Sequence, residues 1–209
     1  SVRAQMKDKK AQFLVLTALD EIAWMLNLRG SDIAYNPVFF SYVVIHEDSF
    51  TVFLNPKQSS DEVKQHLTKE AGEKYEIKPY DEIVAYLKQH SLKIEGFAWF
   101  SENASYALTS LIPAKSLLAE ITPVPLMKAV KNPTEINGMR NSHLKDGAAL
   151  CCYFSWLEKH VKDGNITEIS GAKILDEFRA QQADFVWASF PPISSVGPHG
   201  AIIHYQPQP

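Results

Sequence analysis

The sequence of 209 residues is poor in cysteine: it has two, Cys151 and Cys152, and they are adjacent. Both fall in a segment predicted to be helical, where neighbouring side chains point about 100° apart, so they are not expected to bond to each other. We interpret them as helix-packing residues, with a reactive thiol as the alternative. Two thiols without a disulfide framework are typical of a reducing compartment, so the expected location is cytoplasmic.

Excess charge and long hydrophobic runs are also missing from the sequence. The formal net charge is −3, which gives no electrostatic reason to expect nucleic acid or an anionic membrane as a partner. The longest apolar run, around residues 38–45, is far too short to cross a bilayer. A glycine-rich phosphate loop, a His-Glu-x-x-His motif and an evident Ser/His/Asp set are absent as well, so the enzyme classes that depend on them are not indicated.

Residues 1–125 alternate between strand-like and helix-like segments. The β-branched and aromatic runs 38–45 and 50–54 flank a polar turn and predict an antiparallel hairpin. Thr17 is expected to cap the first helix, and Gly72 to end the helix that begins at Ser59. The alternation as a whole predicts an α/β domain, a mixed sheet flanked by helices. The other predicted strands are 13–16, 75–77, 96–100 and 117–121, and the other predicted helices are 81–90 and 103–112.

The prolines of Thr122-Pro123-Val124-Pro125 interrupt this alternation. Two prolines at alternate positions favour an extended backbone and donate no backbone hydrogen bonds. We therefore expect a domain boundary here, with one domain at residues 1–125 and a second at residues 126–209.

The second domain is predicted to contain two helices followed by two strands. Asn132, with a proline next and Glu135 three residues on, is expected to cap a long helix, and Thr167 a second one. The apolar stripe of the long helix continues for about seven turns and includes His143, which is expected to be buried. The predicted strands would leave an unpaired sheet edge, so we expect this α+β domain to be incomplete in the chain. These strands are 185–190 and 201–205.

Three phrases, spread over essentially the whole chain, resemble one known protein family. The C-terminal phrase from Phe190 to Tyr205 reads F-P-P-I-S-S-V-G-P-H-G-A-I-I-H-Y. An earlier phrase contains L-D-E-I-A-W, N-L-R-G-S-D and N-P-V-F-F-S-Y between residues 19 and 42, and a third contains K-A-V-K-N and H-L-K-D between residues 128 and 146. In this order they are similar to the eukaryotic three-domain Xaa-Pro aminopeptidases (aminopeptidase P), which are metallopeptidases of the pita-bread fold.

The resemblance implies a creatinase N-terminal-like middle domain at residues 1–125 and an incomplete pita-bread catalytic domain at residues 126–209. Complete members of the family remove the N-terminal residue from peptides with proline in second position, use two Mn²⁺ ions, and are expected to be homodimers. Their metal ligands are two aspartates, one histidine and two glutamates that follow the I-I-H-Y phrase, and no such set follows it before Pro209. We therefore expect no metal ligand in this chain and no activity from the chain alone.

His204 is the residue to which the resemblance assigns chemistry. From the sequence alone, a histidine between Ile203 and Tyr205 on a strand is more often a structural residue. The family's histidine at this place contacts the substrate near the scissile bond and helps to move the proton, so the resemblance implies that His204 is catalytic and substrate-binding. His199, at an odd spacing from it, would lie on the opposite face of a strand and is not expected to be a metal ligand.

The sequence leaves two questions open. In Arg29-Gly30-Ser31-Asp32 the arginine either steers a peptide carboxylate or pairs with Asp32 to hold a helix-to-strand turn, and we favour the pair. The chain is either part of a peptidase or part of a non-catalytic pita-bread module that binds peptides or histones, and the I-I-H-Y phrase favours the peptidase. A second chain that supplies the metal ligands is a further alternative.

Overall fold

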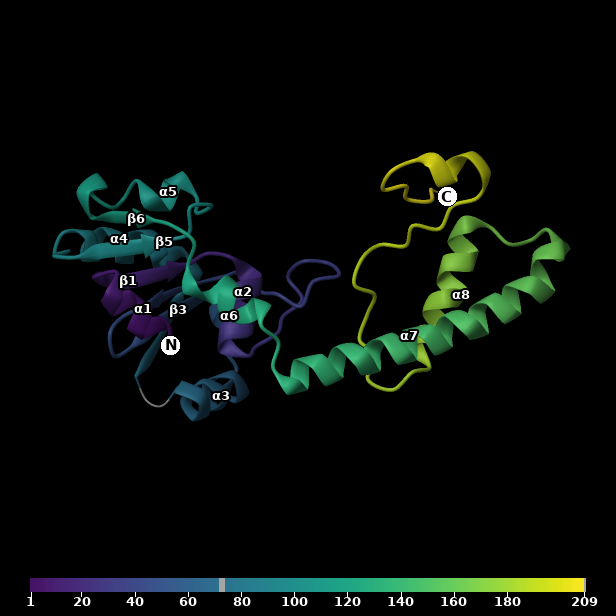
Figure 1. Cartoon of the computed structure of the whole chain (residues 1–209), viewed down its shortest axis with the longest axis horizontal. Coiled ribbons are helices and arrows are strands. Elements are labelled where there is room, and N and C mark those ends of the chain that lie inside the picture. Colours follow the sequence, from purple (N-terminus) through teal and green to yellow (C-terminus); the bar gives the residue numbers. More distant parts are fainter. Residues whose placement is uncertain (72–73, 209) are drawn as a thin grey trace. The chain divides into compact units, whose positions relative to one another are not determined.

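The computed structural model describes residues 1–71 and 74–208 (Figure 1). The chain divides into two compact units, Ser1–Val130 and Lys131–Pro209, which are described separately. The helix end predicted at Gly72 lies outside the described residues. No helix in the described part of the chain is both long enough and apolar enough to cross a membrane.

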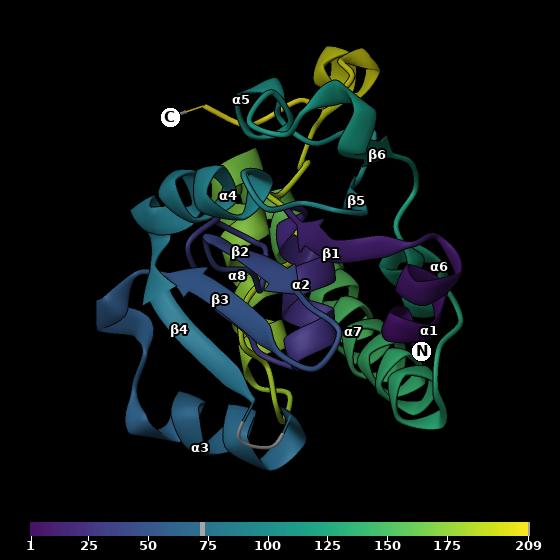
Figure 2. The ribbon, with the colours of Figure 1, turned by 90° about the vertical axis from the view of Figure 1, so that its left-hand side faces the viewer.

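The first unit is built on one mixed sheet of six strands in the order β4-β3-β2-β1-β5-β6 (Figure 2). The pairs β1–β2 and β2–β3 are antiparallel, and the pairs β1–β5, β3–β4 and β5–β6 are parallel. The predicted hairpin is confirmed, with Ser41 opposite Leu54 and Ile45 opposite Phe50. The predicted mixed sheet is confirmed as well. Its strands are β1 (Ala11–Leu16), β2 (Ser41–Ile45), β3 (Phe50–Leu54), β4 (Tyr75–Pro79), β5 (Phe97–Phe100) and β6 (Leu117–Ala119).

Helices flank the sheet and enclose a hydrophobic cluster on each of its faces. Because side chains alternate along a strand, Leu14 and Leu16 of β1 face one cluster while Phe13 and Val15 face the other. Both faces are therefore buried, which is why β3 is apolar at every position except Thr51. The helices are α1 (Val2–Asp8), α2 (Leu19–Leu26), α3 (Asp61–Ala71), α4 (Ile83–Ser91), α5 (Tyr106–Thr109) and α6 (Pro123–Ala129).

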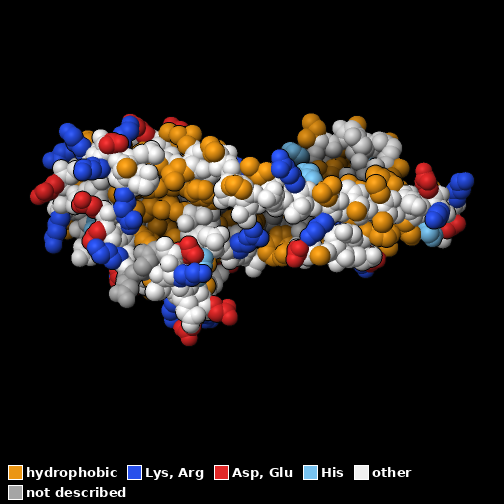
Figure 3. Space-filling view, turned by 60° about the horizontal axis from the view of Figure 1, so that its bottom comes forward, with side chains coloured by type: hydrophobic (Ala, Val, Ile, Leu, Met, Phe, Trp, Pro, Cys, Tyr) orange, Lys and Arg blue, Asp and Glu red, His pale blue; other side chains and the backbone are white. Residues whose placement is uncertain are grey.

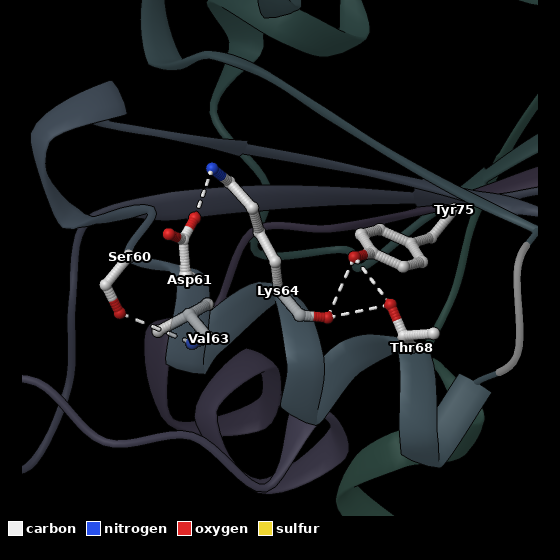
Figure 4. Close-up of polar contacts among 6 residues, drawn as sticks. All are labelled: Ser60, Asp61, Val63, Lys64, Thr68 and Tyr75. Carbon is white, nitrogen blue, oxygen red and sulfur yellow. Dashed lines mark hydrogen bonds and ion pairs between the residues drawn. The ribbon is translucent and has the colours of Figure 1, made fainter.

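Helix α3 is joined to β4 by a small polar network (Figure 4). The Tyr75 hydroxyl of β4 donates to the Lys64 carbonyl at 2.9 Å, and the Thr68 hydroxyl donates to the same carbonyl at 2.8 Å. At the start of the helix, Ser60 Oγ accepts a hydrogen bond from the N–H of Val63 at 3.3 Å. The helix therefore begins slightly later than the start at Ser59 that the sequence predicts.

The predicted cap of α2 is wrong. Ala18, not Thr17, occupies the N-cap position, and it makes no side-chain capping bond. Asp20 does not reach back toward the cap because its carboxylate is bonded to the Lys128 ammonium of α6. This ion pair lowers the pKa of Asp20 through the hydrogen bond from Lys128, so the carboxylate stays charged in the first turn, where the helix dipole favours it.

The extended segment predicted around Pro123 and Pro125 is also wrong, because α6 begins there. Thr122 is the N-cap and Pro123 takes the first helical position, where a missing N–H is not needed and the fixed φ of proline suits a helix. Val124 is fully buried against the first unit's core. The domain division predicted after residue 125 lies within this helix and stays a prediction.

The second unit contains the helices α7 (Pro133–His160) and α8 (Glu168–Ala180). The predicted cap of α7 is confirmed as a complete capping box: Asn132 Oδ1 accepts from the Glu135 N–H at 2.9 Å, and Glu135 Oε2 accepts from the Asn132 N–H at 2.8 Å. Thr167 is confirmed as the cap of α8. Both helices therefore begin at the residues that the local sequence predicts.

The helix pair buries little apolar surface. Ala149 of α7 and Ala172 of α8 are buried, and a Cβ at Gly171 would lie 2.9 Å from the Tyr153 hydroxyl, so the helices approach closely at small residues. His143, predicted to be buried, is exposed, because the shorter α8 covers only part of the α7 stripe. Hydrophobic side chains are visible on the surface of the chain (Figure 3). On α7 the exposed ones include Ile136, Met139, Leu144 and Phe154.

The two strands predicted after α8 are not formed. In the described residues of the second unit, segment 185–190 is irregular, Ala201 ends a short 3-10 helix, Gly197–Ala201, and residues 202–204 form a bend and a turn. A strand needs a partner for its backbone N–H and C=O groups, and no other described segment of this unit is extended into a strand. The two apolar runs are therefore irregular or form turns, and the side chains of Val186, Phe190 and Ile203 are exposed.

Candidate functional site

His204 lies on the surface of the second unit, within a turn rather than a strand. Its side chain is exposed, and its backbone adopts the left-handed conformation with φ of 55°. Non-glycine residues seldom take this conformation, although histidine does so more often than most. Within the described chain the imidazole has no hydrogen-bond partner, so both ring nitrogens remain available.

The carboxylate of Glu168, the first residue of α8, makes several hydrogen bonds to the segment that carries His204. Glu168 Oε1 accepts a hydrogen bond from the Val196 N–H at 2.6 Å and lies 2.9 Å from His199 Nδ1. Glu168 Oε2 accepts from the Tyr205 hydroxyl at 2.6 Å. The structure thus joins three features that are separate in the sequence: the start of α8, the proline-glycine loop and the tyrosine after His204.

The rings of His199 and Tyr205 stack on each other beside this carboxylate. Their centroids are 4.6 Å apart and their planes differ by 27°. Because an ionised carboxylate only accepts hydrogen bonds, His199 carries its proton on Nδ1 toward Glu168. His199 is thus a structural partner of Glu168.

The charges of the cluster support this assignment. The hydrogen bond from Tyr205, followed by that from His199, lowers the pKa of Glu168 below its usual value. The same contact with Glu168 raises the pKa of Tyr205. Near neutral pH, Glu168 is therefore an ionised acceptor and Tyr205 a neutral donor, which is the combination that the hydrogen bonds require.

The Arg29–Asp32 pair that the sequence favours is not formed. Asp32 does hold the turn after α2, but its Oδ2 accepts from the Phe40 N–H at 2.8 Å and its Oδ1 from the Gln58 Nε2 at 2.7 Å. Arg29 is exposed and makes no ion pair with the described residues. Gly30 is required in this turn, because a Cβ there would lie 2.7 Å from Phe39 Cβ.

The residues that the structure describes do not form a metal centre. Across 1–71 and 74–208, no group of three or more His, Cys, Asp or Glu side chains is arranged to hold a metal ion. Cys151 and Cys152 are exposed, so their interpretation as packing residues is wrong.

Sequence reasoning missed Glu168. It directly follows the cap residue Thr167, where the helix dipole favours any carboxylate, so its position alone does not mark it as an anchor. The partners of Glu168 lie 28 to 37 residues further along the chain. The sequence does contain His199 and Tyr205, one on each side of the I-I-H phrase, as possible hydrogen-bond donors. No local pattern, however, connects these two residues to α8.

The chain matches two family descriptions in succession. Residues 1–135 match the Creatinase/Prolidase N-terminal domain, and residues 137–209 match Metallopeptidase family M24. The chain is 44% identical over 208 residues to the Xaa-Pro aminopeptidase ApepP of Drosophila melanogaster, with 99% of this chain and 34% of that protein covered.

Solved structures agree with these matches. The X-prolyl aminopeptidase of Caenorhabditis elegans, described as a cytosolic enzyme with a di-nuclear active site, matches with a TM-score of 0.92 and 35% identity over 100% of this chain and 34% of its own. The N-terminal domain of the FACT complex subunit SPT16 of Cicer arietinum matches with a TM-score of 0.51 and 13% identity over 85% of this chain and 46% of its own, which shows a shared fold alone.

The chain spans about a third of the length of the two aminopeptidases it resembles. The resemblance inferred from the three sequence phrases is confirmed over both units. The chain therefore belongs to the creatinase/prolidase N-terminal domain family, with a metallopeptidase family M24 segment after that domain, in the arrangement of the Xaa-Pro aminopeptidases.

Proposed function

We propose that this chain is part of a metallo-aminopeptidase that removes the N-terminal residue from peptides with proline in second position. The observation that carries the proposal is the similarity to proteins of this name over the whole chain, in both of its units. Peptides with an Xaa-Pro N-terminus are then its partners, and neither nucleic acid nor a membrane is among them. A homodimer and a cytoplasmic location complete the proposal.

Two Mn²⁺ ions are the proposed cofactors of the enzyme. The C. elegans neighbour has a di-nuclear active site, but the residues described in this chain do not fit such a centre. The proposal therefore assigns no metal ligand to this chain and expects the chain alone to be inactive. A purified 209-residue chain that cleaves an Xaa-Pro peptide, or that retains manganese in stoichiometric amount by elemental analysis, would contradict it.

His204 is the residue of this chain proposed to act on the substrate. A neutral imidazole donates a hydrogen bond through one nitrogen and accepts through the other. The exposed side chain of His204 has both nitrogens unengaged within the described residues. It is suited to bind the peptide beside the scissile bond and to hold the proton that passes to the leaving amine.

A non-catalytic module that binds peptides or histones is the second candidate. The observation in its favour is the fold shared with the SPT16 domain. The two candidates differ in whether the protein that contains this chain turns over a prolyl peptide.

The test is the substitution His204→Ala in the enzyme that contains this chain. We expect kcat for an Xaa-Pro peptide to fall by about 10²- to 10⁴-fold, as for other general acid–base groups, with the metal content unchanged. His143→Ala, which alters an exposed histidine of α7, is the matched control and should leave kcat unchanged. Equal turnover of the His204→Ala and unaltered enzymes would refute the assignment of His204.

A further inference from the structure

We propose that Glu168 is the positioning residue of His204, because its carboxylate fixes the loop on which this histidine stands. The inference rests on the proposed catalytic function of His204 and extends it to a residue of a different element. Glu168 acts through the backbone of residues 196–205 and does not itself touch the substrate.

The geometry of the carboxylate supports this role. Its three donors are Val196, His199 and Tyr205, so a single side chain of α8 bonds both ends of the loop that contains His204. The side chain of Glu168 is only 16% exposed. A carboxylate that is largely removed from water requires such partners, and their loss would release the loop from α8.

The backbone of His204 shows why an anchor is needed. Its φ of 55° is a sparsely populated conformation for a residue with a side chain, and such conformations persist only when the surroundings impose them. Next to it, the Tyr205 N–H donates a hydrogen bond to the Ile202 carbonyl at 3.2 Å. The direction of the imidazole is therefore set by the anchored neighbours, and Tyr205, directly after it, is held by Glu168.

An ionised glutamate serves this position better than its amide. A carboxylate accepts charge-assisted hydrogen bonds from all three donors, whereas a glutamine is neutral and its amide end can only donate, so the Tyr205 hydroxyl would have to become the acceptor. The lowered pKa of Glu168 agrees with a charged acceptor at this place. Glu168→Gln thus keeps the size of the side chain and weakens the anchor, because charge-assisted hydrogen bonds are replaced by neutral ones and the bond to Tyr205 must reverse its direction.

The experiment is a double-mutant cycle between Glu168 and His204 in the enzyme that contains this chain. We expect Glu168→Gln alone to lower kcat by about 10²-fold with little change in KM, as for a small misplacement of a reacting group. In the His204→Ala background, Glu168→Gln should cause no further loss, because the group that it positions is gone. Glu158→Gln, an exposed position on α7, is the control, and metal content and the thermal midpoint are measured for every variant.

The outcomes separate the two proposals. If His204→Ala lowers kcat but Glu168→Gln has no effect, or has an equal effect in both backgrounds, the inference is overturned while the proposed function stands. If His204→Ala leaves kcat unchanged, the assignment of His204 fails and the positioning role of Glu168 fails with it, whereas an enzyme that turns over no Xaa-Pro peptide would overturn the proposed function itself.

A second measurement tests the contact without any activity. In the 209-residue chain carrying ¹³C-labelled tyrosine, with Tyr205 assigned from a Tyr205→Phe sample, the phenol should titrate above the usual tyrosine range, and Glu168→Gln should return it to that range. A Tyr205 phenol that titrates normally in the unaltered chain would show that the anchor is not formed and would overturn the inference.

Discussion

The two units of this chain are stabilised in different ways. In the first, helices cover both faces of the sheet, and large side chains such as Phe53 and Leu87 are fully buried. In the second, the buried residues are small, as at Ala149 and Ala172, and polar contacts are prominent: two capping boxes, an Arg179–Asp146 bond of 2.7 Å between the helices, and the Glu168 cluster. The first unit therefore depends on tertiary packing, and the second on local structure and a few polar anchors.

The largest expected difference between the units concerns their phenylalanines. Phe53→Ala removes a side chain buried in the first unit and should lower the free energy of unfolding by about 3–5 kcal/mol. Phe154→Ala removes a side chain that is 57% exposed on α7 and should change it by less than about 0.5 kcal/mol. Denaturant unfolding of both variants provides the measurement. Similar losses would mean that the surface of α7 is covered in solution and that the contrast between the units is false.

A smaller effect is expected at the start of α7. Asn132→Ala removes the capping box and should cost about 1 kcal/mol, because the first helical N–H groups lose their acceptor. Amide hydrogen exchange over the first turns of α7 measures it. Asn141→Ala, an exposed substitution within the same helix, should be neutral or slightly stabilising. If both variants exchange alike, capping does not determine where this helix begins.

The third prediction concerns pH and applies to the first unit alone. His46 Nε2 lies 2.8 Å from the Tyr86 hydroxyl, and the His90 ring lies 5.4 Å from that of His46. Burial, and then the nearby His90, lowers the pKa of His46, while Asp48 opposes the shift. As the pH falls below the ordinary histidine value, the unfolded chain binds a proton that the folded chain resists, so the free energy of unfolding should decrease.

Amide exchange of β2 between pH 8 and pH 5 tests this expectation. At pH 8 both states hold His46 neutral, so no effect is expected there. His46→Gln should flatten the acid side of the profile, because it removes the titrating group. His143→Gln, at an exposed histidine of the second unit, should leave the profile of β2 unchanged. If the stability of β2 still falls with decreasing pH in His46→Gln as steeply as in the unaltered chain, another group causes the acid sensitivity.

Local patterns in the sequence predicted much of the first unit. The hairpin of β2 and β3 follows from its β-branched runs and the polar turn between them, and these signals lie within a few residues of each other. The same holds for the caps at Asn132 and Thr167. The helix at Pro123 was missed because prolines suit both an extended segment and the first turn of a helix, and the burial of Val124 decides between the two.

Features that depend on distant partners were not predictable from local patterns. The runs 185–190 and 201–205 have strand composition, but a strand exists only with a neighbour to bond it. Glu168 and its donors are likewise separated by a helix and a long loop. His204 itself was found through the resemblance of the I-I-H-Y phrase, whereas its left-handed backbone has no sequence signal.

The order of the sheet has a consequence for self-association. Its outermost strands are poor templates for recruiting another chain. β6 is only three residues long, and β4 carries an ion pair between Lys78 and Glu76 at 2.7 Å and ends at Pro79, which has no N–H to offer. Addition of further strands at either edge of the sheet, as in fibril growth, is therefore disfavoured. The inner strands β2 and β3, by contrast, have the composition of aggregation-prone segments.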